Sequence, residues 1–194
     1  MEEKLINLFR ENSGILTIQK LNDNDVSYAT IRKLKNDALI ESIKRGIYKL
    51  VDADIDDFAE TQQLIPNGVF CLFSSAAIHE LTTFVPMEHH ITIHKKRKIS
   101  LPEYPPIQLY YWDTSSYELG VEKVYKNGNL IDVYNAEKTV CDFLRFRNKL
   151  GMDAAKEVLK TYLSSKNRDI SKLVEYAREL RIYAKVNQCL EILL

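Results

Sequence analysis

Hydrophobic side chains recur at helical spacing in three stretches near the start of the chain. Over residues 2–11 they leave a charged opposite face, which predicts an amphipathic helix. A second helix is expected to open at residues 15–17 with Thr17 as its N-cap, because a threonine oxygen can accept a free backbone N–H. Ser27 is predicted to cap a third helix in the same way. The buried side of this third helix is expected to hold Ile31, Leu34 and Ala38.

After Leu39 the pattern changes to short β-prone runs. Strands are predicted at Ile40–Ile43 and Ile47–Val51, with a turn at 44–46 between them. A helix, then a helix-turn-helix, then a hairpin is the element order of a winged helix-turn-helix domain. We therefore assign residues 1–51 to a winged helix-turn-helix DNA-binding domain and residues 52–194 to a second, C-terminal domain.

The junction between the two parts is acidic. Residues 52–60 carry five acidic side chains and no basic one. The stretch either caps the next helix, whose positive N-terminal end favours carboxylates, or forms a solvated linker. Both interpretations stay open on the sequence.

The second part predicts a mixed fold, so the fold class of the whole chain is α+β, ending in several helices. Strands are expected at 68–73, 90–94, 107–112, 121–124 and 130–134. A serine-capped helix is expected at 74–81, a hairpin turn at Asn127-Gly128-Asn129, and helices from Asn135 onward at 135–150, 153–164, 169–181 and 183–193. The aromatic run at 110–112 is expected to pack in a core.

Composition narrows the class of protein. A hydrophobic fraction of 45% supports folded cores, and a formal net charge of zero means that any nucleic-acid contact needs a local basic patch. No apolar run approaches the roughly 20 residues of a membrane span. The charged N-terminal helix does not resemble a signal peptide, and three scattered cysteines suit a reducing compartment. We expect a soluble, cytoplasmic protein.

The third helix and the following turn provide such a patch. Between Arg32 and Lys49, six basic side chains against two acidic ones leave a local net charge of +4. Hydroxyl and guanidinium groups can contact base edges, and lysines suit phosphates. An ordinary solvated helix face is the alternative that charge alone leaves open. The side chains predicted to contact DNA are Ser27, Tyr28, Thr30, Arg32, Lys33, Lys35, Lys44 and Arg45.

Two segments carry recognisable motifs: Gly14–Leu50, with LKNDALIE leading into the RGIY wing, and Asn135–Leu163, with EKTVCD followed by FRNKLG. Both segments resemble those of a known family, the AbiEi antitoxins of bacterial type IV toxin–antitoxin and phage abortive-infection systems. The Asn/Asp turn at 22–25 departs from the glycine that is more usual there. The resemblance implies a repressor that binds inverted repeats in its own promoter. It also implies a C-terminal domain that neutralises a nucleotidyltransferase-like toxin, AbiEii, without necessarily forming a stable complex.

The resemblance further implies that a basic C-terminal surface is antitoxic. The densest basic run is Lys95–Lys98, which also fits a solvated turn, a DNA phosphate contact or an RNA contact. Arg145 with Lys149, and Lys156 with Lys160, are four residues apart and should each share a helix side. The candidate antitoxic residues are Lys95, Lys96, Arg97, Lys98, Lys138, Arg145, Arg147, Lys149, Lys156 and Lys160.

Catalysis and metal binding are not expected. The four histidines and their nearby carboxylates match no metal-ligand spacing, and Glu137 and Asp142 are five residues apart, a poor spacing for one helix face. No phosphate-binding loop, nucleophile elbow or dinucleotide fingerprint is present. We expect no cofactor and no enzyme, and a chain that is monomeric in solution. The alternatives are a plain winged-helix regulator with a ligand-binding or dimerisation domain, or a nuclease or nucleotidyltransferase delivered to DNA.

Overall fold

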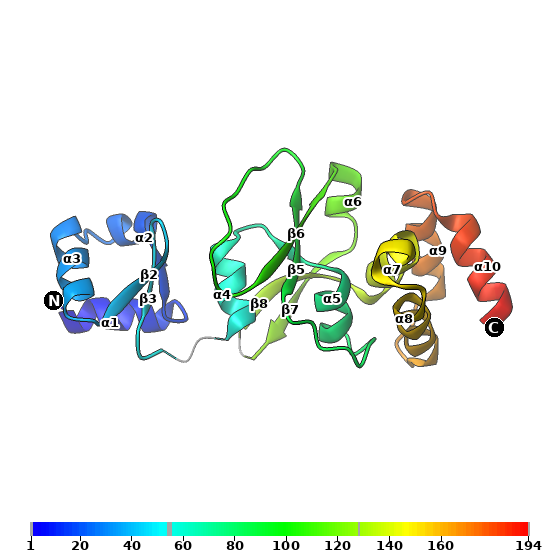
Figure 1. Cartoon of the computed structure of the whole chain (residues 1–194), viewed down its shortest axis with the longest axis horizontal. Helices are drawn as coiled ribbons and strands as arrows, with labels where there is room; N and C mark the ends of the chain where they lie inside the picture. Colours follow the sequence, from blue (N-terminus) through cyan, green and yellow to red (C-terminus); the bar gives the residue numbers. More distant parts are fainter. Residues whose placement is uncertain (1, 54–55, 128, 194) are drawn as a thin grey trace.

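The chain forms a mixed α+β fold with two sheets and a group of helices at its C-terminal end (Figure 1). The structure, a computed structural model, describes residues 2–53, 56–127 and 129–193. The helices are α1 (Glu2–Glu11), α2 (Ile18–Asp23), α3 (Tyr28–Asn36), α4 (Asp57–Leu64), α5 (Leu72–Ile78), α6 (Thr114–Glu118), α7 (Ala136–Leu150), α8 (Met152–Ser164), α9 (Ile170–Glu179) and α10 (Tyr183–Leu193). The strands are β1 (Ile15–Thr17), β2 (Ile40–Lys44), β3 (Ile47–Leu50), β4 (Val69–Phe70), β5 (His89–His94), β6 (Ile107–Trp112), β7 (Val121–Lys126) and β8 (Asn129–Tyr134).

Residues 2–50 form three helices and an antiparallel sheet of order β1-β3-β2. Both predicted N-caps are confirmed, because Thr17 accepts a hydrogen bond from the backbone N–H of Lys20 and Ser27 accepts one from Thr30. The second helix was expected to open at residues 15–17, and this was wrong: these residues form the strand β1, which pairs with β3. The β-branched Ile15, 1% exposed, suits a strand that packs on the core, and such tertiary contacts override local helix signals.

The hairpin β2–β3 is confirmed, and its turn has a specific backbone requirement. The register shifts between Ser42 and Lys44, which marks a bulge just before the turn. Gly46 has φ +77°, a left-handed conformation that glycine adopts at little cost, and a Cβ there would lie 3.1 Å from Ile18 Cγ2. Ala38 was predicted to lie on the buried side of the third helix, and this was wrong. It follows the end of α3 with φ +54°, and its side chain is exposed.

The second sheet has the order β6-β5-β4-β8-β7. Its β5–β6 and β4–β8 pairs are parallel and its outer β7–β8 hairpin is antiparallel. The predicted strand at 68–73 is only two residues long, because Leu72 already starts α5. Asn127 enters the predicted turn with φ +49°, and Gly128 lies outside the described residues.

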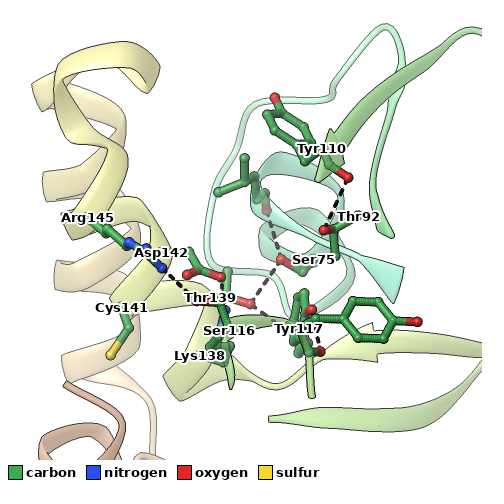
Figure 2. Close-up of polar contacts among 12 residues, drawn as sticks. Ser75, Thr92, Tyr110, Ser116, Tyr117, Lys138, Thr139, Cys141, Asp142 and Arg145 are labelled. Carbon is green, nitrogen blue, oxygen red and sulfur yellow. Dashed lines mark hydrogen bonds and ion pairs between the residues drawn. The ribbon is translucent and has the colours of Figure 1, made fainter. Parts of the chain in front are cut away.

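The serine cap predicted for this helix was wrong, because α5 begins earlier and its serines are buried in packing contacts. Ser74 Oγ accepts a hydrogen bond from the backbone N–H of His90 at 2.8 Å, which ties α5 to β5. Thr139 Oγ1 donates to Ser75 Oγ at 3.0 Å, which ties α5 to α7. Figure 2 shows this Ser75–Thr139 contact between the two helices.

The two sheets share one apolar cluster. Ile15 and Ile47 of the first sheet pack with Leu64 of α4 and with Phe70 and Ile131 of the second sheet. In the intervening acidic stretch, Asp56 follows the capping interpretation, Asp52 is exposed, and residues 54–55 lie outside the described residues. Asp56 is the N-cap of α4, and its carboxylate accepts hydrogen bonds from the backbone N–H groups of two following residues at 3.1 and 3.2 Å. The N-terminal unit and the second sheet therefore contact each other directly.

Helix α7 packs between the second sheet and the other C-terminal helices. Asn135 caps it as predicted, accepting from the backbone N–H of Lys138 at 3.0 Å. The N-terminal half of α7 is buried, and this overturns the prediction that Lys138 belongs to a basic surface: its side chain is 0% exposed. Lys138 Nζ pairs with Asp142 Oδ2 at 2.5 Å, and it lies 4.1 Å from the Trp112 ring centroid and 4.3 Å from that of Tyr134. Local spacing could not show this, because Trp112 belongs to a distant strand.

The buried pair yields a stability prediction. Lys138→Met would leave the Asp142 carboxylate buried without its cation, which costs about 3–5 kcal/mol of unfolding free energy. Replacing both residues, as Lys138→Met with Asp142→Ala, removes the uncompensated charge and should restore at least half of that loss. Urea denaturation of the full chain measures both values.

Lys160→Met is the matched control, because it makes the same chemical change on the exposed side of α8. Its effect should stay within about 0.5 kcal/mol. Equal losses in the single and double variants would contradict the role given to the ion pair.

Candidate functional site

The side chains predicted to contact DNA lie around α3 and at the β2–β3 turn. Six of the eight are exposed, and Thr30 and Lys44 are half-buried. Tyr28, at the start of α3, is 72% exposed, while Ile31 and Leu34 anchor the opposite face in the core. The exposed ones are Ser27, Tyr28, Arg32, Lys33, Lys35 and Arg45.

Some of these side chains are already engaged within the protein. The Ser27 hydroxyl caps α3 and shares a hydrogen bond with Thr30 Oγ1 at 2.9 Å. Lys33 Nζ contacts Glu2 Oε2 at 3.2 Å, and this hydrogen-bonded carboxylate raises the Lys33 pKa. Among the described residues, no carboxylate lies within 4.0 Å of Arg32 or Lys35. These two side chains, with Tyr28, are therefore the most available on α3.

The turn after β2 places Arg45 in solvent and Lys44 partly against the hairpin. Lys49, which contributed to the predicted basic patch, points to acidic partners instead. Its Nζ lies 3.3 Å from Glu41 and 3.8 Å from the buried carboxylate of Glu60. The effective positive charge of this surface therefore comes mainly from α3 and the turn.

The basic run Lys95–Lys98 follows β5 in a loop. Lys95, Lys96 and Lys98 are exposed, whereas Arg97 is half-buried. Arg97 Nη1 donates to the carbonyl oxygen of Pro66 at 2.7 Å, which attaches the loop to the segment before β4. The three lysines are therefore exposed to solvent, whereas the arginine holds the loop in place.

The remaining basic candidates on the C-terminal helices separate into two clefts. The first, which we call the helical cleft, has a volume of about 520 Å³ and lies between α7, α8 and α10. Arg147, Lys156 and Lys160 line it together with apolar side chains such as Leu159. The sequence missed Lys185 on α10, which also lines this cleft and which only the packing of α10 brings there.

The second, which we call the strand cleft, has a volume of about 460 Å³ and lies between the end of β6, α6 and α7. Arg145 and Lys149 line it, which agrees with their predicted common helix side. Figure 2 shows Arg145 reaching from α7 to Ser116, and Arg145 Nη1 donates to Ser116 Oγ at 3.1 Å. The aromatic run was expected in a core, which holds for Trp112 but is wrong for Tyr111, 51% exposed at this cleft.

The histidines are held by neighbouring groups on the second sheet. His90 is 8% exposed, its ring stacks on Tyr110, and its Nδ1 lies 2.9 Å from the Tyr110 hydroxyl. Burial lowers the pKa of His90 to about 4, and burial raises the pKa of Tyr110 to about 12. His90 is therefore neutral at pH 7, and its Nδ1 shares a hydrogen bond with the Tyr110 hydroxyl. His79 instead contacts the carbonyl oxygen of Tyr134 through Nε2 at 2.7 Å.

The chain matches no protein-family model and no curated protein. Within the described residues, no group of three or more His, Cys, Asp or Glu side chains is arranged to hold a metal ion. In that same part of the chain, none of the helices combines the length and apolar character that crossing a membrane requires.

The low pKa of His90 predicts acid sensitivity. The unfolded chain takes up a proton near pH 6.5, whereas folded His90 does so only near pH 4. The stability it contributes is therefore present above pH 6.5 and is lost as the pH falls toward 4. Between pH 7 and 5 this loss amounts to about 2 kcal/mol at most.

His90→Gln should flatten the pH dependence of unfolding free energy in this window, because glutamine does not titrate. His94→Gln, at the half-exposed end of the same strand, is the control. Denaturant melts at pH 7, 6 and 5 compare the three proteins. Parallel curves for wild type and His90→Gln would show that folded His90 titrates as in the unfolded chain.

Proposed function

We propose that this chain is a bacterial antitoxin that also represses its own operon. Residues 1–51 act as a winged helix-turn-helix domain on inverted repeats in the promoter, and residues 52–194 neutralise a nucleotidyltransferase-like toxin. The protein is cytoplasmic and monomeric in solution, and it neutralises the toxin without necessarily forming a stable complex with it. The resemblance to AbiEi antitoxins motivates this proposal.

The observation that carries the DNA-binding part is the order α1-β1-α2-α3-β2-β3 with its exposed basic side chains. In winged helix-turn-helix proteins the helix after the turn enters the major groove and the hairpin contacts the backbone or minor groove. Here α3 corresponds to the helix that enters the major groove, and the β2–β3 turn corresponds to the hairpin tip. The exposed side chains are Tyr28, Arg32 and Lys35 on α3 and Arg45 at the turn.

The antitoxin part is supported by the helical cleft. Three of the basic residues singled out from the sequence, Arg147, Lys156 and Lys160, gather there with Lys185 around an apolar floor. An apolar floor with a cationic rim suits an acidic protein surface, because electrostatic complementarity favours the encounter and burial retains the partner.

A binding role is also favoured over catalysis by the state of the two carboxylates on α7. Glu137 accepts a hydrogen bond from Tyr162 at 3.0 Å and pairs with Lys172 at 3.4 Å. Asp142 pairs with Lys138. Glu137 is thus engaged at both oxygens, whereas Asp142 is engaged at Oδ2 and its buried Oδ1 has no hydrogen-bond partner within the described residues. A plain winged-helix regulator with a ligand-binding domain is the second candidate, and the strand cleft is the feature that favours it.

For DNA binding, Arg32→Ala and Arg45→Ala should each weaken binding to the upstream promoter region. A lost phosphate contact lowers affinity across sequences and reduces the salt slope by about 1. Arg32→Ala should in addition relax specificity, because arginine reads guanine through paired hydrogen bonds. Gel shifts over a salt series measure these effects.

Lys166→Ala serves as the control, since it removes an exposed charge beyond α8. Lys33→Ala should weaken binding less than Arg32→Ala, because Lys33 is paired with Glu2. Wild-type affinity for Arg32→Ala, Lys33→Ala and Arg45→Ala alike would refute the winged interpretation.

For neutralisation, the double change Lys156→Gln and Lys160→Gln should reduce protection of cells that express the adjacent nucleotidyltransferase-like toxin. A loss of about 1.4 kcal/mol in the free energy of binding between this chain and its target corresponds to a tenfold lower affinity. Lys95→Gln with Lys96→Gln removes the same charge from the loop after β5 and tests the other basic site. Growth after toxin induction is the measurement, and promoter binding of the same variants is the control.

If both double variants protect as wild type does, these basic surfaces are not antitoxic. If the wild-type chain itself gives no protection to cells that express the toxin, the antitoxin proposal fails while the DNA-binding proposal stands.

A further inference from the structure

Strand β6 lies at one end of the second sheet, and one of its edges is free. In the described part of the chain, β5 is the strand that pairs with it. The carbonyl oxygen of Trp112 faces β5, because it accepts a hydrogen bond from Lys95 N at 2.7 Å. The backbone groups of successive residues in a strand point to opposite sides, so those of Leu109 and Tyr111 point to the free edge.

This edge lacks the features that usually block the addition of a strand. The six residues of β6, IQLYYW, include no charged side chain and no proline. Strand β7, at the opposite end of the sheet, carries Glu122, Lys123 and Lys126. Charges and prolines commonly protect edge strands, because unpaired backbone groups otherwise pair with another extended chain. Of these two edges, β6 is therefore the one open to a further strand.

The strand cleft opens onto the free edge of β6. Three consecutive residues, Tyr110–Trp112, line it, although successive side chains of a strand point to opposite faces. The cleft therefore reaches the backbone of β6. Its other wall is the second half of α7, with Arg145, Phe146 and Lys149. Extended peptides bind to such exposed edges by adding a strand to the sheet.

The two faces of β6 differ in what they contact. Tyr110 and Trp112 pack in the apolar cluster that contains Phe143 of α7, whereas Leu109 packs in the cluster on the other face of the sheet. Tyr111 shares the face of Leu109, because side chains alternate along a strand. An added strand would therefore direct every second side chain toward the α7 wall.

The α7 wall is cationic. Arg145 is half-buried and donates from Nη1 to Ser116 Oγ at 3.1 Å, and Lys149 follows one turn later and is exposed. Within the described ranges, no carboxylate lies within 4.0 Å of either cation. Asp113 also lines the cleft, but its carboxylate caps α6 by accepting from Ser116 N at 3.0 Å. A guanidinium held in place favours a carboxylate partner, which it can bind through two hydrogen bonds.

We propose that the strand cleft binds an extended acidic peptide segment as a further strand on β6. The peptide backbone pairs with Leu109 and Tyr111, and an Asp or Glu side chain directed toward α7 binds Arg145 and Lys149. A side chain two positions away faces the same wall and contacts Phe146, so an aliphatic residue is favoured there. The site is separate from α3, the β2–β3 turn and the helical cleft, so this inference does not rest on the proposed function.

A random heptapeptide library displayed on phage is selected against the full-length protein. The most enriched sequences that lack tryptophan are synthesised as end-blocked peptides. Trp112, the sole tryptophan of the chain, lines the cleft, so its fluorescence measures each Kd, and calorimetry confirms it. Enriched peptides should carry Asp or Glu two positions from an aliphatic residue. Changing that acid to its amide, or Arg145→Gln in the protein, should raise the Kd by about tenfold or more.

Tyr111→Pro and Tyr111→Thr form a matched pair. Both remove the ring, but only proline removes the backbone N–H that points to the free edge, a position where edge strands tolerate proline. Tyr111→Pro should raise the peptide Kd by about tenfold, and Tyr111→Thr by less than about twofold. Peptides N-methylated at each position in turn test the same hydrogen bonds in the wild-type protein, independently of how the proline variant folds.

Hydrogen exchange measured by NMR locates the added strand. Saturation with peptide should slow exchange of the Leu109 and Tyr111 amides by about tenfold or more, because these N–H groups become paired. The Gln108 and Tyr110 amides, which point to β5, should change little. Lys156→Gln with Lys160→Gln in the helical cleft is the control and should leave the peptide Kd unchanged.

The proposal is overturned if no peptide is selected or if the selected peptides lack acidic residues. It is also overturned if Tyr111→Pro and Tyr111→Thr weaken binding equally, or if exchange at Leu109 and Tyr111 stays unchanged. Sedimentation of the free protein tests a second copy as the occupant. A wild-type dimer that Tyr111→Pro converts to a monomer would assign the edge to that copy and overturn the proposal as well.

Discussion

A buried lysine fixes how the second sheet meets the C-terminal helices. Lys138 cannot be left without partners in an apolar core, because an isolated charge there would cost far more than the chain's net stability. Asp142 on the same helix supplies the counter-charge, and Trp112 and Tyr134 supply two aromatic faces from the sheet. The ammonium group, the carboxylate and the two aromatic rings must therefore lie within contact distance of one another. This requirement fixes the rotation of α7 about its axis as well as its distance from the sheet.

That rotation distributes the remaining charges of α7. Lys138, Asp142, Arg145 and Lys149 are spaced by four, three and four residues, so they form one stripe along the helix. The stripe is buried in its first half and opens into the strand cleft in its second half. Arg147 stands about half a turn away from Arg145 and faces α8 and α10 instead. One buried ion pair thus orients both clefts.

Local signals predicted the elements better than they predicted burial. The caps Ser27 and Asn135 and the strand Ile107–Trp112 were identified because hydroxyl or amide caps and apolar periodicity act over a few residues. Strand β1 was missed because its pairing with β3 is made by residues far along the chain. Lys138 was misplaced for the same reason, since charge alone indicates solvent and only the assembled sheet brings Trp112 over it. Lys185 needed the packing of α10.

The same long-range contacts qualify the predicted boundary between residues 51 and 52. Ile15 and Ile47 contribute to the cluster that also holds Phe70, and Ser13 donates a hydrogen bond to Asn129 at 2.8 Å. Separating the two parts would expose these isoleucines, at a cost of about 25 cal/mol for each Å² of apolar surface. The sequence pattern changes at this boundary, but one apolar cluster contains residues from both sides of it. A displacement of β1 or β3 would therefore be transmitted first to Phe70 and the strands beside it, because closely packed side chains cannot yield independently.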